Sequence, residues 1–539
     1  MQEYTQGMSL EEQIGQVISV GFHGLAPTPE IIDLIQKHFV GNVILFTRNI
    51  HSPQQVSELT QTLQRIARDA GHRHPLLISV DQENGMVRRL EEGVPAFPGN
   101  MALSAIDDEQ LVYEVARATG HNLYVLGINT NLAPVLDINS NPNNPAIGVR
   151  SFGEDPQQVA RFAAAAVKGY RASGIVAALK HFPGHGDTPA DPHLSLPVIP
   201  RSLEQLEELE LVPFRAGIAA GTESVMVSHM YMPGLMQQSI PTTVSREVVT
   251  DLLRKRLGFE GMVTTDCMEM KAVSDTIGTE RAAVMALQAG VDMVLISHSY
   301  SRQIGSIEAI KAAIADGGLS PEVVRLAAEH VLRLKARRLS WDALTHPLEQ
   351  EEMQAHRELG ERAYALSTTL VRNDEGLLPL HVRPDQRVLL VFPRPQAYTL
   401  AVDKFMPYDV FEESVRRRVS QVTALTIHET ASQEEYAQLD QAVREADLVI
   451  TVTLNASIDP RQAEIFQRVL SAGRQTIGVA VYNPYDLLAF PQLQSYLVTY
   501  ECTTPALEAA IRVLFGEVVA QGRLPVSLPG LYERGHRAR

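Results

Sequence analysis

Cysteine is nearly absent from this chain of 539 residues, which contains only Cys267 and Cys502, far apart in the sequence. A disulfide-stabilised scaffold needs several cysteines, and a cysteine-ligated metal centre needs them in closely spaced pairs. The sequence therefore excludes both of these classes of protein.

Positive charge is also scarce. The chain has 47 lysines and arginines against 63 aspartates and glutamates, which gives a formal net charge of −16. A nucleic-acid-binding protein normally carries a basic patch, so we expect no nucleic-acid partner. The same excess of negative charge disfavours binding to anionic membranes.

Long apolar stretches are missing as well. No uninterrupted run approaches the ~18 residues of a membrane-spanning helix. The N-terminal stretch MQEYTQGMSLEEQIGQV has neither the basic n-region nor the apolar h-region of a signal peptide. We expect a cytoplasmic protein without a membrane partner, or an exported form if a leader has been removed.

Hydrophobic residues make up 45% of the chain and charged residues 20%, as in a globular protein with a substantial core. The first part contains short apolar runs separated by amphipathic stretches. Strands are predicted at 16–22, 42–47, 76–81, 131–137, 175–181, 224–229, 262–266 and 293–298, and helices at 53–70, 155–173, 245–257 and 303–316. Eight such alternating units predict a parallel (β/α)8 TIM-type barrel.

The pattern changes after residue 340, where LSWDALTHPLEQEE indicates a linker or crossover. A second alternating series follows, with strands predicted at 388–393, 422–427, 446–454, 476–483 and 495–502 and helices at 409–419, 433–445, 461–472 and 505–520. It predicts a smaller, doubly wound α/β sandwich domain. We therefore expect a catalytic barrel over 1–340, a linker over 341–365 and a second domain over 366–539. No GxGxxG turn follows its first strand, which disfavours dinucleotide binding.

Most barrel strands end in a polar residue. These strand-end residues are Thr47, Asp81, Asp137, Lys180 with His181, His229, Asp266 and His298. Each alone could be a turn residue. Because the carboxyl ends of barrel strands form the face that carries active sites, their repetition predicts a site there.

The stretch KHFPGHGDTPADPH, residues 180–193, holds three histidines among glycines and prolines. One interpretation is a metal-dependent hydrolase, with His181, His185, Asp187 and His229 as ligands. Zinc needs three or four converging ligands, and this spacing is only a weak signal for them.

A glycosidase is a second interpretation. Asp266 ends a strand, which suits a nucleophile held by a rigid element, although Asp is also a common helix cap. In Asp191-Pro192-His193, residues i and i+2 share a face of an extended backbone, so the carboxylate can orient the imidazole for proton transfer. An Asx-turn with an exposed histidine remains an equal alternative. Sugar hydroxyls are expected to contact the charged side chains of Asp81, Arg89, Arg150, Lys180 and His181.

A family resemblance favours the second interpretation. The stretches that carry it are VDQENGMVRRL, LAPVLDIN, RSFGEDP, KHFPGHGDTPADPH, VMVSHMYMP, LGFEGMVTTDCMEM and AGVDMVL, with TTLVRNDEGLLPL and VLFGEVVAQGRLPVSLP in the second domain. With them the chain resembles glycoside hydrolase family 3, specifically its β-N-acetylglucosaminidase branch. KHFPGHGD with a following D-x-H is the diagnostic part. Departures from the usual pattern are Asn84, Met86, Val149 and Pro192, and none removes a catalytic group.

The resemblance implies roles for the candidate residues. Asp266 corresponds to the nucleophile, His193 to an unusual acid/base and Asp191 to its partner. The positions that bind N-acetylglucosamine (GlcNAc) are Asp81, Arg89, Arg150, Lys180 and His181, and Asp137 and His229 are possible lining residues.

The implied enzyme is a retaining exo-β-N-acetylglucosaminidase that needs no metal and no cofactor. Its implied substrate is terminal β-linked GlcNAc, from peptidoglycan fragments of the GlcNAc–MurNAc type. A phosphorylase using the same site, the metal-dependent hydrolase and a non-catalytic glycan-binding protein stay open as alternatives, and no oligomeric state is predicted.

Overall fold

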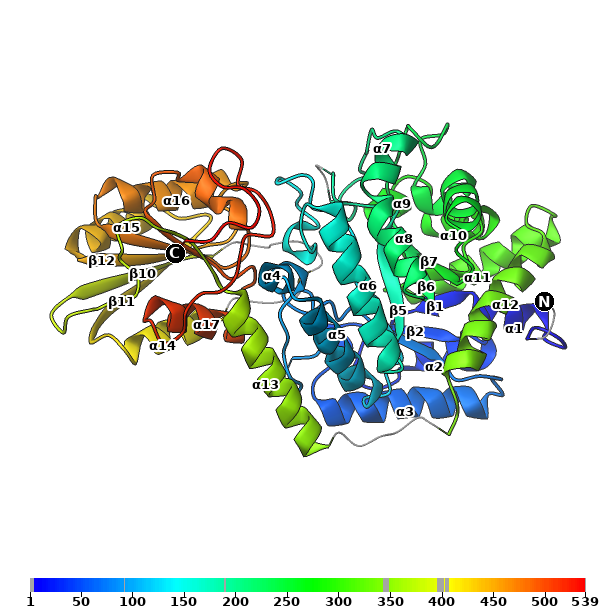
Figure 1. Cartoon of the computed structure of the whole chain (residues 1–539). Helices are drawn as coiled ribbons and strands as arrows, with labels where there is room; N and C mark the ends of the chain where they lie inside the picture. Colours follow the sequence, from blue (N-terminus) through cyan, green and yellow to red (C-terminus); the bar gives the residue numbers. More distant parts are fainter. Residues whose placement is uncertain are drawn as a thin grey trace.

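The computed structural model describes residues 4–91, 93–188, 191–342, 349–394, 402 and 407–538. The chain forms a larger N-terminal domain and a smaller C-terminal domain that lie side by side (Figure 1). Within the described residues no helix is long and apolar enough to cross a membrane.

The N-terminal domain is a closed barrel of eight parallel strands, which confirms the predicted TIM-type fold. The strands are β1 (Ile18–Val20), β2 (Asn42–Leu45), β3 (Leu77–Val80), β4 (Thr130–Asn131), β5 (Val176–Phe182), β6 (Ser224–Val227), β7 (Met262–Cys267) and β8 (Met293–Ile296). Almost every strand residue is buried. This explains why the strands could be recognised as continuous apolar runs, since both faces of a parallel sheet are covered.

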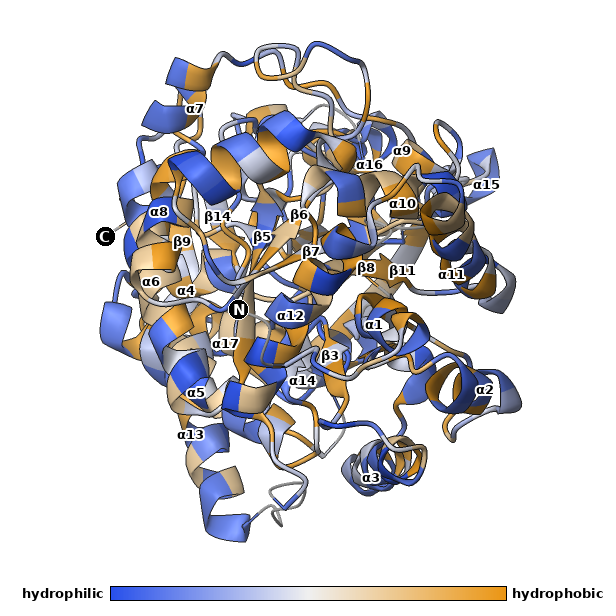
Figure 2. Cartoon of the chain, turned by 90° about the vertical axis from the view of Figure 1, so that its right-hand side faces the viewer, coloured by the Kyte–Doolittle hydropathy of each residue, from blue (hydrophilic) through white to orange (hydrophobic). Residues whose placement is uncertain are grey.

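Helices surround the barrel. They are α1 (Leu10–Gln16), α2 (Pro29–Lys37), α3 (Pro53–Asp69), α4 (Asn100–Ile106), α5 (Glu109–Tyr124), α6 (Pro156–Ala172), α7 (Leu203–Glu208), α8 (Leu211–Ala219), α9 (Lys271–Ser274), α10 (Thr279–Ala289), α11 (Tyr300–Ala315) and α12 (Pro321–Arg338). In Figure 2, hydrophilic and hydrophobic residues alternate along these helices, which surround the barrel strands. The helix predicted at 245–257 is a π-helix, Glu247–Arg256.

Two barrel helices begin as their sequences predict. Ser52 and Asp155 cap α3 and α6 by accepting hydrogen bonds from the backbone N–H groups of Gln55 and Gln158, and each helix has a proline in its first turn. Such caps satisfy amides that lack partners inside the helix, and proline is tolerated there because its missing N–H is not needed.

The fourth strand is shorter than predicted, because β4 ends at Asn131 instead of residue 137. Pro134 has no N–H to donate to a neighbouring strand, which interrupts the regular ladder. The chain nevertheless stays in the barrel wall, since the Leu136 N–H donates to the Lys180 carbonyl at 2.7 Å. At the end of this irregular segment, Asp137 lies near the carboxyl ends of the barrel strands, beside β5.

The predicted linker over 341–365 is largely helical. Helix α13 (Gln350–Ser367) packs against α4 and α5 of the barrel and against α17 of the second domain. It leads from the underside of the barrel to the second domain (Figure 1). Residues 343–348 of the predicted linker lie outside the described residues.

The second domain contains a six-stranded sheet in the order β11-β10-β12-β13-β14-β9. Its strands are β9 (Thr369–Asn373), β10 (Arg387–Arg394), β11 (Gln421–His428), β12 (Leu448–Thr453), β13 (Gln475–Ala480) and β14 (Ser495–Val498). Its helices are α14 (Tyr408–Arg416), α15 (Gln433–Glu445), α16 (Pro460–Ser471) and α17 (Thr504–Leu514). The doubly wound α/β class is as predicted, but the sequence analysis missed the antiparallel edge strand β9.

The two domains share buried contacts beside the carboxyl ends of the barrel strands. Met101 and Val149 of the barrel belong to the hydrophobic core of the second domain. The Glu501 carboxylate accepts a hydrogen bond from the Gly99 N–H at 2.7 Å, and Asn139 Nδ2 donates to the Tyr485 hydroxyl at 3.0 Å. These contacts hold the second domain against the loops that shape the barrel mouth.

Candidate active site

A cavity of about 430 Å³ lies at the carboxyl ends of the barrel strands. Its volume is in the range of small-molecule sites. The eight residues predicted to be catalytic or sugar-binding line it, namely Asp81, Arg89, Arg150, Lys180, His181, Asp191, His193 and Asp266, and so do Thr47, His185 and His298. These eight side chains come from five separate parts of the chain and meet at the face where barrel enzymes carry their active sites.

One wall of the cavity is a cluster of two cations and two carboxylates. Lys180 Nζ lies 2.7 Å from Asp81 Oδ1 and 2.6 Å from Glu83 Oε1. The Arg150 guanidinium donates two hydrogen bonds to Glu83, at 2.9 Å and 2.8 Å. Bidentate contacts of this kind fix the orientation of both groups.

The charges in this cluster stabilise one another. Burial opposes ionisation of Glu83, but the Arg150 and Lys180 charges outweigh it and hold the pKa of that carboxyl well below its usual range. Burial also disfavours the charged form of Lys180, yet Asp81 and Glu83 raise its pKa. Glu83, Lys180 and Arg150 therefore stay charged and, with Asp81, present a fixed array to a polar ligand.

Glu83 was missed by the sequence analysis, although it is central to this cluster. The only signal for it is its place in Asp81-Gln82-Glu83, the polar segment that directly follows β3. Arg89 belongs to the same segment, lines the cavity, and is held through its backbone N–H by Gln82 Oε1 at 2.9 Å.

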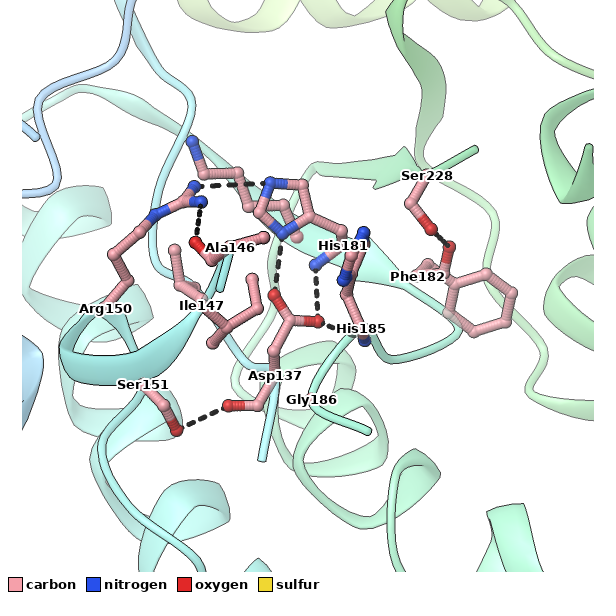
Figure 3. A network of polar contacts seen from close by, with 12 residues as sticks. Asp137, Ala146, Ile147, Arg150, Ser151, His181, Phe182, His185, Gly186 and Ser228 are labelled. Carbon is pink, nitrogen blue, oxygen red and sulfur yellow. Dashed lines mark hydrogen bonds and ion pairs between the residues drawn. The ribbon is translucent and has the colours of Figure 1, made fainter. Parts of the chain in front are cut away.

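His181 is oriented by Asp137. The Asp137 carboxylate lies 2.7 Å from His181 Nδ1 through Oδ2, while its Oδ1 accepts the His185 backbone N–H at 2.7 Å (Figure 3). The other ring nitrogen of His181, Nε2, lies 3.5 Å from Arg150. Burial raises the pKa of Asp137, but the neighbouring His181 and His185 lower it overall. Asp137 thus fixes the ring that lines the cavity.

Asp137 and His229 are not lining residues, which corrects that expectation for both. Each lies one layer beneath the cavity, because its side chain is used to support a residue above it. His229 Nε2 lies 2.9 Å from the Cys267 carbonyl oxygen, and its Nδ1 lies 2.6 Å from Thr243 Oγ1. His229 therefore supports the end of β7, next to Asp266.

The four side chains considered as metal ligands do not converge. Asp187 forms an ion pair with Arg201 at 2.8 Å, and His229 is occupied beneath β7. His185 Nδ1 lies 3.0 Å from Thr188 Oγ1, and burial lowers the pKa of His185 to about 4, which keeps it neutral. Among the described residues no three His, Cys, Asp or Glu side chains are arranged to hold a metal ion.

Asp266 lies near the carboxyl end of β7, and its side chain faces the cavity. Its Oδ1 accepts the Cys267 N–H at 2.7 Å. Burial opposes ionisation, but the His181, His229 and His193 imidazoles lower the pKa of Asp266 to about 2. The next helix, α9, has Met270 at its N-cap, so Asp266 is not a helix cap. It is an ionised carboxylate at the mouth of the barrel.

Asp191 and His193 form a hydrogen-bonded pair at the same cavity. Asp191 Oδ1 lies 2.7 Å from His193 Nδ1 and also accepts the His193 backbone N–H at 2.9 Å. The Pro192 carbonyl between them accepts a hydrogen bond from the Ala272 N–H, which ties the loop to the segment after β7. Burial disfavours the charged imidazole, but Asp191 and Asp266 outweigh it and raise the pKa of His193. The ring therefore keeps its proton to a higher pH than a free imidazole does.

Asp266 and His193 thus share one polar cavity, so a nucleophile and a proton donor are both available to a small polar substrate. Residues 9–334 match the glycosyl hydrolase family 3 N terminal domain, and residues 368–535 match its C-terminal domain. The chain belongs to glycosyl hydrolase family 3 and is a glycoside hydrolase.

Several relatives are similar over most of the chain. β-Hexosaminidase A of Pseudoalteromonas piscicida is 29% identical over 93% of this chain and 91% of its own length. The structure of a family 3 β-N-acetylglucosaminidase from Paenibacillus sp. is 37% identical, with a TM-score of 0.89 over 97% of this chain and 99% of that one.

A fungal multi-domain family 3 β-N-acetylglucosaminidase, described with a GCN5-related glucosamine N-acetyltransferase region, is 42% identical with a TM-score of 0.92. The comparison covers 98% of this chain but only 62% of the longer fungal protein.

Proposed function

We propose that this protein is a retaining exo-acting β-N-acetylglucosaminidase. The observation that carries the proposal is the presence, in one cavity, of the ionised Asp266 and the Asp191–His193 pair. Retaining hydrolysis needs a nucleophile and an acid/base, and the lowered pKa of Asp266 and the raised pKa of His193 suit these two roles.

In the first step, Asp266 attacks the anomeric carbon of the sugar while the bond to the leaving oxygen breaks. His193, protonated and held by Asp191, gives its proton to that oxygen, so the aglycone leaves as a neutral alcohol. The low pKa of Asp266, caused by nearby imidazoles despite burial, keeps it ionised for the attack. The product of this step is a glycosyl ester of Asp266 and a neutral His193.

In the second step, neutral His193 takes a proton from water as the water oxygen attacks the anomeric carbon. The ester bond to Asp266 breaks, the sugar leaves with its original configuration, and both side chains return to their starting charges. Asp191 holds the imidazole in one tautomer throughout, because its carboxylate faces Nδ1 and leaves Nε2 for the substrate.

The charged wall suits the binding of sugar hydroxyl groups. Asp81 and Lys180 are fixed by each other, and Arg150 is fixed by Glu83, so their remaining donors and acceptors are preorganised. His181, oriented by Asp137, adds a further polar atom. We assign the N-acetylglucosamine unit to this wall.

The preference for an N-acetylhexosamine is supported by the relatives named β-hexosaminidase and β-N-acetylglucosaminidase. We further propose terminal GlcNAc of peptidoglycan fragments, GlcNAc linked to MurNAc, as the natural substrate, used inside the cell in wall recycling. The support for this narrower substrate is the resemblance carried by KHFPGHGD and the following D-x-H.

The deciding experiment compares wild type and Asp266→Ala on aryl β-glycosides of GlcNAc, GalNAc, glucose and xylose, together with a muropeptide. We expect wild type to prefer GlcNAc and Asp266→Ala to lose essentially all turnover. Near-normal turnover by the variant contradicts the assignment. Assays with added phosphate distinguish a phosphorylase, which would release GlcNAc-1-phosphate, and a chelator that abolishes activity would favour a metal-dependent hydrolase.

A further inference from the structure

A second cavity, of about 490 Å³, lies between the two domains. The barrel contributes part of the segment 139–149, and the second domain contributes residues that follow β11, β12 and β13. None of its lining residues lines the active-site cavity. The two cavities are neighbours because they share a wall: Ala146, Ile147 and Arg150 face the active site, while Gly148 and Val149 face the second cavity.

The second cavity lies at the position in the second domain where open α/β sheets commonly bind ligands. From β10 the chain continues to β11 on one side, and it then crosses to β12 on the other side of β10. Ligands of open α/β sheets bind at the carboxyl ends of the strands, beside the point where the strand order reverses. Asn455 follows β12 and Glu429 follows β11, and both line the cavity. The barrel covers the opening of this crevice.

The lining is rich in carboxamides. Five side chains of this type line the cavity: Asn139, Asn144, Asn455, Gln462 and Asn483. Asn139 Oδ1 is buried and has no hydrogen-bond partner among the described residues, although its Nδ2 donates to Tyr485. Because buried polar atoms are normally paired, this oxygen favours a ligand that carries a hydrogen-bond donor.

The charges of the lining disfavour an anionic ligand. Arg461 is the cation among the described lining residues, and it lies 3.1 Å from Asp459 and 3.3 Å from Glu429. Two carboxylates thus compensate one guanidinium, and the lining keeps a net negative charge. Nor is the segment after β12, Asn455–Asp459, a glycine-rich phosphate loop. Nucleotides and phosphates, the usual ligands at such crevices, do not fit this chemistry.

We infer that the interdomain cavity is a second, non-catalytic site that binds an uncharged saccharide unit. Sugar hydroxyls both donate and accept hydrogen bonds, as carboxamides do, so the two match without charge. Tyr482 and Tyr485 supply aromatic surface for the apolar face of a sugar ring. The inference deepens the proposed function and rests on it only for the choice of sugar.

The cavity also adjoins the catalytic loop. Asn144 lines it and donates through Nδ2 to the carbonyl oxygens of His185 and Gly186, at 2.9 Å each. Asn144 Oδ1 accepts the Ala146 and Ile147 N–H groups, which belong to the wall of the active site. A saccharide in the second site therefore touches the residue that joins the catalytic loop to the Arg150 turn.

The test is titration calorimetry of chitobiose into three proteins that do not turn it over: Asp266→Asn alone, and Asp266→Asn combined with Asn455→Trp or with Glu464→Trp. An indole at 455 would project into the cavity and take up part of the space for a sugar ring, whereas Glu464 is exposed on helix α16 and is the matched control. We expect Asn455→Trp to lower the number of chitobiose molecules bound per chain by one, and Glu464→Trp to leave that number unchanged. The same stoichiometry in all three proteins overturns the inference.

The single variants Asn455→Trp and Glu464→Trp are assayed with aryl β-GlcNAc, and both should keep wild-type turnover and melting temperature. Ile458→Trp, at an exposed lining position, replaces Asn455→Trp if that variant fails to fold. If wild type does not hydrolyse any GlcNAc glycoside, the proposed function fails. The calorimetric comparison, repeated with glucose and cellobiose, then still decides whether the second site exists.

Discussion

The carboxylate of Asp191 lies 2.7 Å from Nδ1 of His193, and the ring of His193 shares a cavity with Asp266. The pair comes from one short loop, whereas Asp266 comes from the end of β7. The proposed nucleophile and the proposed acid/base therefore come from different elements, and each can be replaced without removing the other.

Replacing His193 should separate substrates by their leaving groups. In His193→Ala, the disaccharide has no proton donor for its departing oxygen, so kcat/KM should fall by about 10²–10⁴-fold. A dinitrophenyl β-GlcNAc needs little protonation and should be largely spared. The measurement is kcat/KM for both substrates, with His51→Ala, on the exposed surface, as the control. An equal loss on both substrates would contradict the role of His193 as acid.

Replacing Asp191 should change the pH dependence. Burial lowers the pKa of His193, but the hydrogen bond and charge of Asp191 raise it overall. Because His193 must be protonated to act as the acid, activity should fall as the pH rises through that pKa. In Asp191→Asn the carboxylate that stabilises the imidazolium is lost, so the alkaline limb should move to lower pH.

The measurement is the pH profile of kcat/KM on a disaccharide, which reports the ionisations of the free enzyme. Asp251→Asn is the control, because its exposed carboxylate pairs with Lys255 and does not line the active-site cavity. An unchanged alkaline limb in Asp191→Asn would argue against the pair as the titrating unit.

Much of the fold follows from sequence patterns with a simple physical origin. The barrel strands are buried on both faces, so Val176–Phe182 and its counterparts are nearly continuous apolar runs. The length of β4 was predicted wrongly, because Leu132–Leu136 is as apolar as a strand. Pro134 within this segment is the sequence signal against a regular strand. Strand β9 was missed because a lone edge strand after a helix has no alternating neighbours to reveal it.

Part of the site was predictable because position along a strand fixes position in space. Asp81, Lys180 and Asp266 follow or end strands, and the structure places them in the cavity. Glu83 lies in an irregular segment, where no periodicity says which way a side chain points. Whether Asp137 faces the cavity or supports His181 depends on side-chain direction, which sequence spacing does not determine.

Glu83 should matter for stability as well as for binding. In Glu83→Gln, Lys180 and Arg150 remain buried with Asp81 as the one remaining carboxylate of the cluster. Breaking a buried ion pair on one side costs about 3–5 kcal/mol, because a charge is left uncompensated. Urea unfolding should show a loss of that order, and KM for aryl β-GlcNAc should rise.

The matched control for Glu83→Gln is Asp447→Asn, which breaks the exposed pair between Asp447 and Arg387. Exposed pairs contribute little to stability because solvent screens their charges, so this variant should unfold almost as wild type does. Equal losses in the free energy of unfolding for the two variants would show that the buried cluster stabilises the protein no more than an exposed ion pair does.

Arg201 should position His193 from a distance. It pairs with Asp187 at 2.8 Å and lies 3.1 Å from Glu210, and so joins the two ends of the segment that carries Asp191 and His193. In Arg201→Met these two ion pairs are lost, and the resulting displacement of His193 can reduce the rate by up to about 100-fold. Because the defect acts through His193, it should reduce kcat on a disaccharide far more than on the dinitrophenyl glycoside.

Arg215→Met is the control for this variant, because Arg215 forms an exposed pair with Glu207 on the same side of the barrel. It should leave both substrates unaffected. If Arg201→Met instead lowers turnover of both substrates equally, together with the melting temperature, Arg201 supports the fold in general. A selective loss with an unchanged melting temperature identifies it as the residue that positions the acid/base loop.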